Sequence, residues 1–240
     1  MSFMRTLTLL FTLTAITLCA QNRPAPVLPL LETGFTQIFD GTTLKGWDCD
    51  PDYWRVEGGA IVGETKADKQ PKQNIFCIWR GGEPADFDLK LKYKLTRGNS
   101  GIQYRSVELP NVNKWVLKGY QADIDAEQVY SGQIYEERGR GFLALRSQFA
   151  YISEFEKSGS FASLGDDKEL KALIKNEDWN EMEIVARGNT VMQFVNGRLM
   201  SAVVDDDKLN RKMVGLIGIQ LHLTKTGMKM ETKDIRIKIF

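Results

Sequence analysis

Apolar and polar residues alternate along most of the chain in short runs, and turn residues separate one run from the next. The clearest run is Asp86–Leu95, in which apolar side chains take every second position from Phe87 and charged ones lie between them. Successive side chains of a strand point to opposite faces. This alternation is therefore typical of a strand with one face on a core and one face in solvent.

The same pattern predicts strands over much of the remaining chain. They are Tyr53–Val56, Ala60–Gly63, Gly101–Ser106, Tyr120–Asp125, Gln133–Glu137, Gly141–Leu145, Phe149–Phe155, Trp179–Arg187, Thr190–Val195, Arg198–Val204, Met213–Leu223 and Lys229–Phe240. Gly58-Gly59 and Asn196-Gly197 are typical hairpin turns. Only Asp166–Ile174 predicts a helix, because acidic residues open it and apolar ones follow at intervals. Many strands and one short helix indicate an all-β fold, a two-sheet antiparallel sandwich.

Composition narrows the class of protein further. The chain has 240 residues, 42% of them hydrophobic, which is enough for one sizeable core. It shows no repeat and no change of composition, so we expect one domain over residues 34–240. Its 32 Lys and Arg nearly balance 31 Asp and Glu, so charge gives no reason to expect a nucleic-acid partner.

The first 20 residues predict a signal peptide, because Arg5 precedes an apolar run that is too short to span a membrane. A lipidated Cys19 is the alternative, but Leu18 occupies a position that needs a small residue. Residues 21–33 carry three prolines and predict an extended, Pro-rich leader. We therefore expect a periplasmic or extracellular protein without a membrane span.

Export would leave Cys49 and Cys77 in an oxidising compartment, where a disulfide can form. Spacing alone does not give the geometry of such a bond, and Cys77 lies in the apolar run Ile75–Trp79, where a free cysteine could simply be buried. The sequence leaves open whether these two cysteines form a disulfide or stay free. One histidine and two such cysteines argue against a zinc site of the Cys/His type.

Candidate chemistry gathers on one face of three predicted strands. In Tyr120–Asp125 the apolar residues alternate with Gln121, Asp123 and Asp125, and buried carboxylates are costly unless they are paired or used. The other two strands divide in the same way, so that one face would carry Gln103, Arg105, Gln121, Asp123, Asp125, Gln220 and His222. Amides, carboxylates and guanidinium groups suit a polyhydroxylated ligand. The alternative is that these residues are polar only because this face of the sheet is exposed to solvent.

The segment Tyr135–Arg140 reads YEERGR and adds charge next to two glycines. It is either a charged turn whose ion pairs matter little or a loop at the rim of the cleft. In the second case Glu136 or Glu137 would act as an acid or base and Arg138 would orient the substrate.

Several motifs, in this order along the chain, resemble the bacterial 3-keto-disaccharide hydrolase domain family. They are FDGTTLKGW (Phe39–Trp47), WRVEGGAIVG (Trp54–Gly63), GNSGIQYR (Gly98–Arg105), GYQADID (Gly119–Asp125), YSGQIYEERGRG (Tyr130–Gly141), GLIGIQLH (Gly215–His222) and DIRIK (Asp234–Lys238). The resemblance covers 34–240. It implies a concanavalin A-like jelly roll, export, and action on glycosides already oxidised to a ketone at the third ring carbon.

A ketone acidifies the hydrogen on the neighbouring carbon, so that its removal can expel the aglycone and water can then add. Such a site needs a base, a donor at the ketone oxygen and an acid at the leaving oxygen. The resemblance implies Asp123 or His222 as the base, Arg105 or a metal at the ketone, and Glu136 at the leaving group. It leaves open which aspartate of the QADID run takes the catalytic role.

Two further hypotheses and one cofactor stay open. Asp123, Asp125 and Glu127 alternate at about 6.6 Å along a strand, close to the roughly 5–5.5 Å between the carboxyl groups of a retaining glycosidase such as a laminarinase. The same face could instead belong to a lectin-like binding module without catalysis. A divalent metal could bind Asp123 and Asp125, because hard cations favour carboxylate oxygens. The sequence leaves the oligomeric state unknown.

Overall fold

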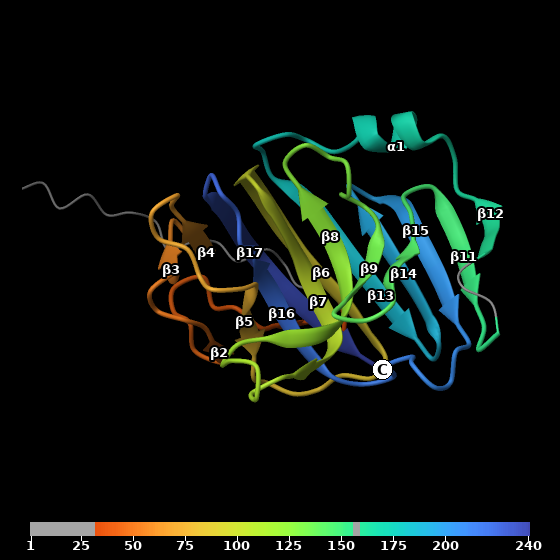
Figure 1. The fold of residues 1–240 in the computed structure, drawn as a ribbon, viewed down its shortest axis with the longest axis horizontal. Helices are drawn as coiled ribbons and strands as arrows, with labels where there is room; N and C mark the ends of the chain where they lie inside the picture. Colours follow the sequence, from red (N-terminus) through yellow and green to blue (C-terminus); the bar gives the residue numbers. More distant parts are fainter. Residues whose placement is uncertain (1–31, 156–158) are drawn as a thin grey trace, which may run out of the picture.

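The computed structural model describes residues 32–155 and 159–240, and the predicted signal peptide therefore lies outside the described residues. Two sheets pack face to face (Figure 1). The first has ten strands, and its main path runs β12-β11-β15-β14-β13-β6-β17-β4-β3, with β1 beside β17. The second has seven strands in the order β10-β9-β8-β7-β16-β5-β2. This architecture confirms the all-β sandwich.

The strands of the ten-stranded sheet are β1 (Thr36–Gln37), β3 (Trp54–Glu57), β4 (Ala60–Thr65), β6 (Phe87–Arg97), β11 (Gln148–Ile152), β12 (Gly159–Ser163), β13 (Asn180–Arg187), β14 (Thr190–Val195), β15 (Arg198–Asp205) and β17 (Met228–Ile239). Those of the seven-stranded sheet are β2 (Trp47–Asp48), β5 (Ile75–Trp79), β7 (Asn99–Glu108), β8 (Leu117–Asp125), β9 (Ile134–Glu137), β10 (Gly141–Ala144) and β16 (Leu216–Leu221). One pair departs from the antiparallel prediction, because β11 runs parallel to β15.

Both predicted hairpin turns are present. Gly58 and Gly59 join β3 to β4 and have positive φ angles of 59° and 80°. Asn196 and Gly197, at 50° and 77°, join β14 to β15. Positive φ at both central residues matches the right-handed twist of the strands, which explains why glycine and asparagine occupy these positions.

The predicted helix is present as α1 (Asp167–Ala172), which covers one end of the sandwich (Figure 1). The side chain of Asp166 caps it by accepting hydrogen bonds from the backbone N–H groups of Lys168 and Glu169. Across the two described ranges, no helix is long and apolar enough to cross a membrane.

Strand β5 escaped prediction because it is apolar at every position instead of alternating. Cys77 and its neighbours on one face join the core between the sheets, while Phe76 and Ile78 form a second, smaller cluster with Leu117. Trp115 of the β7–β8 loop packs against this smaller cluster, so the loop covers part of the outer face of the seven-stranded sheet. A strand buried on both faces reads as a continuous apolar run.

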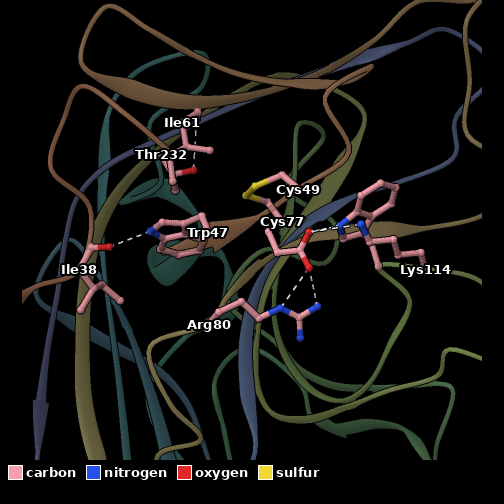
Figure 2. The surroundings of a disulfide bond; sticks show 10 residues. Ile38, Trp47, Cys49, Ile61, Cys77, Arg80, Lys114 and Thr232 are labelled. Atoms are coloured by element: carbon pink, nitrogen blue, oxygen red, sulfur yellow. Dashed lines mark hydrogen bonds and ion pairs between the residues drawn. A yellow bond between two sulfur atoms is a disulfide. The ribbon is translucent and has the colours of Figure 1, made fainter. Parts of the chain in front are cut away.

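A disulfide joins Cys49, just after β2, to Cys77 in the middle of β5 (Figure 2). Nearby, the indole N–H of Trp47 donates to the carbonyl of Ile38, and Arg80 donates to Asp48. The bridge links two cysteines that are 28 residues apart in the sequence, and so closes a loop of that length. A loop of that length stabilises a fold by about 3–4 kcal/mol in the chain-entropy model.

Candidate functional site

The three strands that carry the predicted polar face are direct neighbours, in the order β8-β7-β16. Gln103 lies opposite Gln121, and Gly101 lies opposite Asp123. Ile219 pairs with Ile102, which places Gln220 beside Gly101. Because the residues between them pack into the core, the polar set points away from it, onto the outer face of the seven-stranded sheet.

The part of this face that the β7–β8 loop leaves uncovered is hollowed. The hollow has a volume of about 330 Å³ and is lined by Asn74, Asn99, Gln121, Asp123, Tyr130, Tyr135, Glu137, Phe142, Gln220 and His222. It brings together four residues of the predicted site: Gln121, Asp123, Gln220 and His222. We call it the cleft.

Asp123 is the most strongly perturbed acid in the cleft. Its side chain is buried, and it accepts a hydrogen bond of 2.7 Å from the amide Nε2 of Gln121. Burial raises the pKa of Asp123 to about 7, the Gln121 hydrogen bond opposes that rise, and the negative charges of Glu137 and Asp125 add to it. A carboxyl group that titrates near neutral pH is suited to proton transfer.

Gln220 is fully buried, yet neither atom of its amide has a hydrogen-bond partner among the described residues. A buried, unpaired amide is costly, and a ligand hydroxyl or carbonyl could satisfy it. His222 follows β16, and its Nδ1 lies 2.7 Å from the carbonyl oxygen of Leu223. If Nδ1 donates to that oxygen, Nε2 is left to exchange a proton with a ligand.

The structure corrects the choice between the two glutamates. Glu136 pairs with Tyr120 and shares its core-facing side, whereas Glu137 pairs with Gly119 and shares the face of the cleft. Glu136 is buried and accepts a hydrogen bond of 2.6 Å from Nε of Arg140. Glu137 lines the cleft and accepts a hydrogen bond of 3.3 Å from Asn74. The glutamate available to a ligand is therefore Glu137.

Arg105 also leaves the predicted face. Its φ is 47°, and the pairing of β7 with β8 shifts register between Tyr104 and Val107, so the alternation breaks at this residue. The buried guanidinium donates to the carbonyl oxygens of Ala85 (2.7 and 2.8 Å) and Gly188 (2.7 Å). Arg105 thus ties the seven-stranded sheet to loops of the other sheet and does not line the cleft.

Two other predicted residues lie at the margin. Asp125 accepts hydrogen bonds from the backbone N–H groups of Val129, Tyr130 and Ser131, so it shapes the β8–β9 loop. Arg138 is exposed in the β9–β10 turn and donates to the side chain of Gln73 without lining the cleft.

Gln103 belongs to the predicted face but is fully buried beneath it. It donates to Oε1 of Gln121 at 3.4 Å and therefore supports a cleft residue without lining the cleft itself.

The row of three alternating carboxylates does not exist in the folded chain. Strand β8 ends at Asp125, and Glu127 lies in the following turn with its side chain exposed. The spacing behind the laminarinase hypothesis therefore has no counterpart.

The metal that the sequence left open would use Asp123 and Asp125, but both carboxylate oxygens of Asp125 accept backbone hydrogen bonds from the β8–β9 loop. Within 32–155 and 159–240, no three His, Cys, Asp or Glu residues are grouped to hold a metal ion. The residues present do not fit the metal that the sequence left open.

Sequence reasoning missed the aromatic wall of the cleft. Tyr130 and Phe142 stack with ring centres 5.7 Å apart, and Tyr135 meets Phe142 edge to face at 5.1 Å. Both Tyr130 and Phe142 are exposed. Exposed, stacked rings offer the apolar surface on which the C–H face of a sugar can lie. Alternation assigned Phe142 only to a strand, and nothing in the sequence marked Asn74 or Asn99.

A larger hollow, of about 640 Å³, lies around Arg140, Ile152 and Asp207. Here Arg140 binds three carboxylates: Glu136 and Asp205 at 2.6 Å, and Asp207 at 3.3 Å. Burial opposes the charge of Arg140, but the hydrogen bonds that Arg140 donates to Asp205 and Glu136 raise its pKa above the usual value. Arg140 neutralises the carboxylates of this larger hollow, whereas no Lys or Arg lines the smaller cleft, so the smaller cleft is the better candidate for chemistry.

Known proteins resemble this chain in part of its sequence and in its fold. A curated relative, the 3-keto-disaccharide hydrolase of Bacteroides thetaiotaomicron, is 32% identical over 95 residues. That alignment covers 36% of this chain and 32% of the relative, so the match spans about a third of the relative's length.

Two solved structures share the fold. A protein of Parabacteroides distasonis named as a candidate glycosyl hydrolase has a TM-score of 0.55 and 16% identity, covering 86% of this chain and 99% of its own. The carbohydrate-binding module CBM66 of Bacillus subtilis has a TM-score of 0.51 and 14% identity, covering 82% and 96%. The model of one family matches residues 34–238, almost the whole described chain. The chain belongs to the 3-keto-alpha-glucoside-1,2-lyase-like domain family.

Proposed function

We propose that the protein cleaves glycosides that carry a ketone at the third ring carbon, by elimination of the aglycone followed by addition of water. The observation that carries this proposal is the convergence of Asp123, Glu137 and His222 in one cleft, beneath an aromatic wall. The family and the name of the curated relative support the substrate class.

Asp123 is the base in this proposal. Its carboxylate removes the proton from the carbon between the ketone and the anomeric centre, and the electron pair left behind forms an enolate. The enolate collapses to a carbon–carbon double bond as the bond from the anomeric carbon to the aglycone oxygen breaks. Water then adds across that double bond. A base with a pKa near 7 is ionised in about half of the molecules at neutral pH and binds a proton strongly enough to remove it from the sugar.

Gln220 takes the role that the sequence suggested for Arg105. Its buried amide lacks a partner, and its Nε2–H can donate to the ketone oxygen as negative charge develops there. A neutral donor that is buried and has no competing partner needs little reorganisation during the reaction.

Two groups can protonate the departing oxygen, the carboxyl of Glu137 and the imidazole of His222. Both line the cleft with Asp123. No Lys or Arg is among the lining residues, so the cleft is acidic and disfavours an anionic sugar. We therefore propose a neutral substrate.

The test compares a 3-keto-glucoside with its unoxidised parent and follows aglycone release by mass spectrometry, with and without a chelator. We expect release from the keto sugar alone and no effect of the chelator. Asp123→Asn should lower the rate of release about a thousandfold, and Glu137→Gln and His222→Gln should each lower it by less. Glu136→Gln is the matched control, because it changes the same residue type one position away on the opposite face.

Non-catalytic sugar binding is the second candidate function, since exposed stacked rings alone can hold a sugar. Calorimetry on the same sugars separates the two. Saturable binding without any product would refute the enzymatic proposal and leave a binding module. Cleavage of the unoxidised parent would instead indicate an ordinary glycosidase.

We also propose that the protein is exported to the periplasm or the cell exterior. The Cys49–Cys77 bridge supports this, because structural disulfides persist in oxidising compartments. Cell fractionation followed by N-terminal sequencing of the processed chain tests it, and an unprocessed cytoplasmic chain would overturn it.

A further inference from the structure

Behind the cleft, a line of side-chain hydrogen bonds runs from Ser106 through two glutamines to Asp123. The Ser106 hydroxyl lies 2.8 Å from Oε1 of Gln103, Nε2 of Gln103 lies 3.4 Å from Oε1 of Gln121, and Nε2 of Gln121 lies 2.7 Å from Oδ1 of Asp123. All four side chains are buried. We propose that Gln103 and Ser106 are positioning residues, which set the orientation of Gln121 and so the proton affinity of Asp123.

Each bond in this line fixes the direction of the next. The Ser106 hydroxyl has two acceptors in reach, Oε1 of Gln103 at 2.8 Å and the carbonyl oxygen of Tyr104 at 3.1 Å. Donation to the nearer one leaves Nε2 of Gln103 to face Gln121. Gln121 must then present its oxygen to Gln103 and its Nε2 to Asp123. The alternative orientation would place two acceptor oxygens, those of Gln121 and Asp123, against each other.

Two glycines make room for this line. A Cβ on Gly101 would lie 2.6 Å from Cδ of Gln121, so Gln121 can cross the strand only because position 101 has no side chain. A Cβ on Gly119 would lie 2.4 Å from Oγ of Ser106. The two glycines therefore leave room for the side chains of Gln121 and Ser106. A face that is polar only because it is exposed to solvent would not require that room.

The line leaves Asp123 with one engaged and one available oxygen. Oδ1 accepts from Gln121, whereas Oδ2 accepts no hydrogen bond from any described residue. The groups that face Asp123 from neighbouring elements are Glu137 and Tyr135 of β9, Tyr130 of the β8–β9 loop and His222 after β16, with Asp125 on its own strand. Because Gln121 favours the ionised form, losing it should strengthen proton binding by Asp123.

The experiment follows Asp123 by carboxyl ¹³C NMR titration of the labelled protein, with its signal assigned from the Asp123→Asn spectrum. The titration needs no substrate. It therefore tests the line of hydrogen bonds separately from the proposed function, on which the inference rests. We expect a wild-type midpoint near 7. Gln121→Met should raise this midpoint by about one pH unit, because a hydrogen bond to a charged group is lost.

Gly101→Ala is the sharpest variant, because it removes no polar group and position 101 has no strained φ. The added methyl should displace Gln121 and raise the midpoint about as much as Gln121→Met. Gly159→Ala is its control, since a Cβ there meets nothing within 4 Å. Gln103→Met should raise the midpoint by about half a unit and Ser106→Ala by less, because each acts only through Gln121.

Unchanged midpoints in both Gln103→Met and Ser106→Ala would overturn the proposal, whatever Gln121→Met does. If the midpoints move as expected but the wild type releases no aglycone, the line of hydrogen bonds stands and the proposed function fails. In an active enzyme, the acidic limb of the kcat/KM profile should move with the NMR midpoint, which a loss of folding alone would not produce.

Discussion

Two groups of carboxylates lie on opposite faces of β8 and β9, and their hydrogen-bond partners differ in kind. On the core side, Glu136, Asp205 and Asp207 surround the guanidinium of Arg140. On the cleft side, Asp123 receives a single amide hydrogen bond. Neighbouring residues of one strand, Glu136 and Glu137, belong to different groups.

The difference separates carboxylates that stabilise the fold from carboxylates that can take part in a reaction. A carboxylate held by a cation and several donors stays ionised and rigid, so it is poorly suited to accept a proton. A carboxylate that is buried without a cation is costly to ionise, so its pKa is raised. The raised pKa makes it a base near neutral pH. Pairing, and not burial, marks which acids can react.

Asp123→Asn should give the largest effect on reactivity. Loss of the base is expected to lower kcat/KM for the keto-glucoside about a thousandfold, within the range of general base catalysis. Release at more than about a tenth of the wild-type rate would contradict the role of Asp123.

The same variant should be more stable than the wild type at high pH. The pKa of Asp123 is about 7 in the folded protein against an ordinary 3.8, so the folded state holds this proton more tightly than the unfolded chain does. Asp123 therefore costs the fold nothing below about pH 4, an increasing amount up to about pH 7, and the full amount above that. We expect the Tm of Asp123→Asn to exceed that of the wild type by several degrees at pH 8, with the gap closing on acidification to pH 4.

Arg140→Met should show the opposite behaviour, a loss of stability without a direct loss of chemistry. It leaves three buried carboxylates without their cation, and breaking a buried ion pair in this way costs about 3–5 kcal/mol. Urea denaturation measures the change. Arg138→Met is the control, because Arg138 is an exposed arginine of the same turn and should change stability by less than about 0.5 kcal/mol. Equal effects of the two variants would contradict the comparison.

Glu137→Gln and Glu136→Gln sharpen the comparison to adjacent residues. Glu137→Gln should lower kcat/KM about a hundredfold if Glu137 protonates the leaving oxygen, with the fold unaffected. Glu136→Gln should leave kcat/KM within about twofold but lower the unfolding free energy by about 1–3 kcal/mol, because a charge-assisted hydrogen bond to Arg140 is lost. Reversed results would place the reactive glutamate on the core side.

This pair also shows how far sequence reasoning reaches. Alternation predicted the sandwich, most strands and the shared face of Gln121, Asp123 and Gln220, because side-chain parity is a local property of a strand. Choosing between Glu136 and Glu137 required the register of β9 against β8, which depends on the whole sheet.

Arg105 shows the second limit. The φ of Arg105 is 47°, and this irregular backbone turns its side chain away from the face that alternation predicted. The residue type at this position did not indicate the irregularity. Asn74 and the aromatic wall reach the cleft from loops, from β9 and from β10, and only the folded chain fixes the relative positions of these elements.

Phe142→Ala should give the smallest effect. Its ring stacks on Tyr130 and meets Tyr135, so its loss removes part of a platform and no reacting group. Stacking of this kind contributes about 0.5–1.5 kcal/mol, which corresponds to a rise in KM of about two- to twelvefold with kcat unchanged. Phe161→Ala controls for loss of an exposed ring, since Phe161 lies on β12 of the other sheet. A fall in kcat at constant KM would show that the wall contacts the transition state and would extend the reactive group beyond the acids of the cleft.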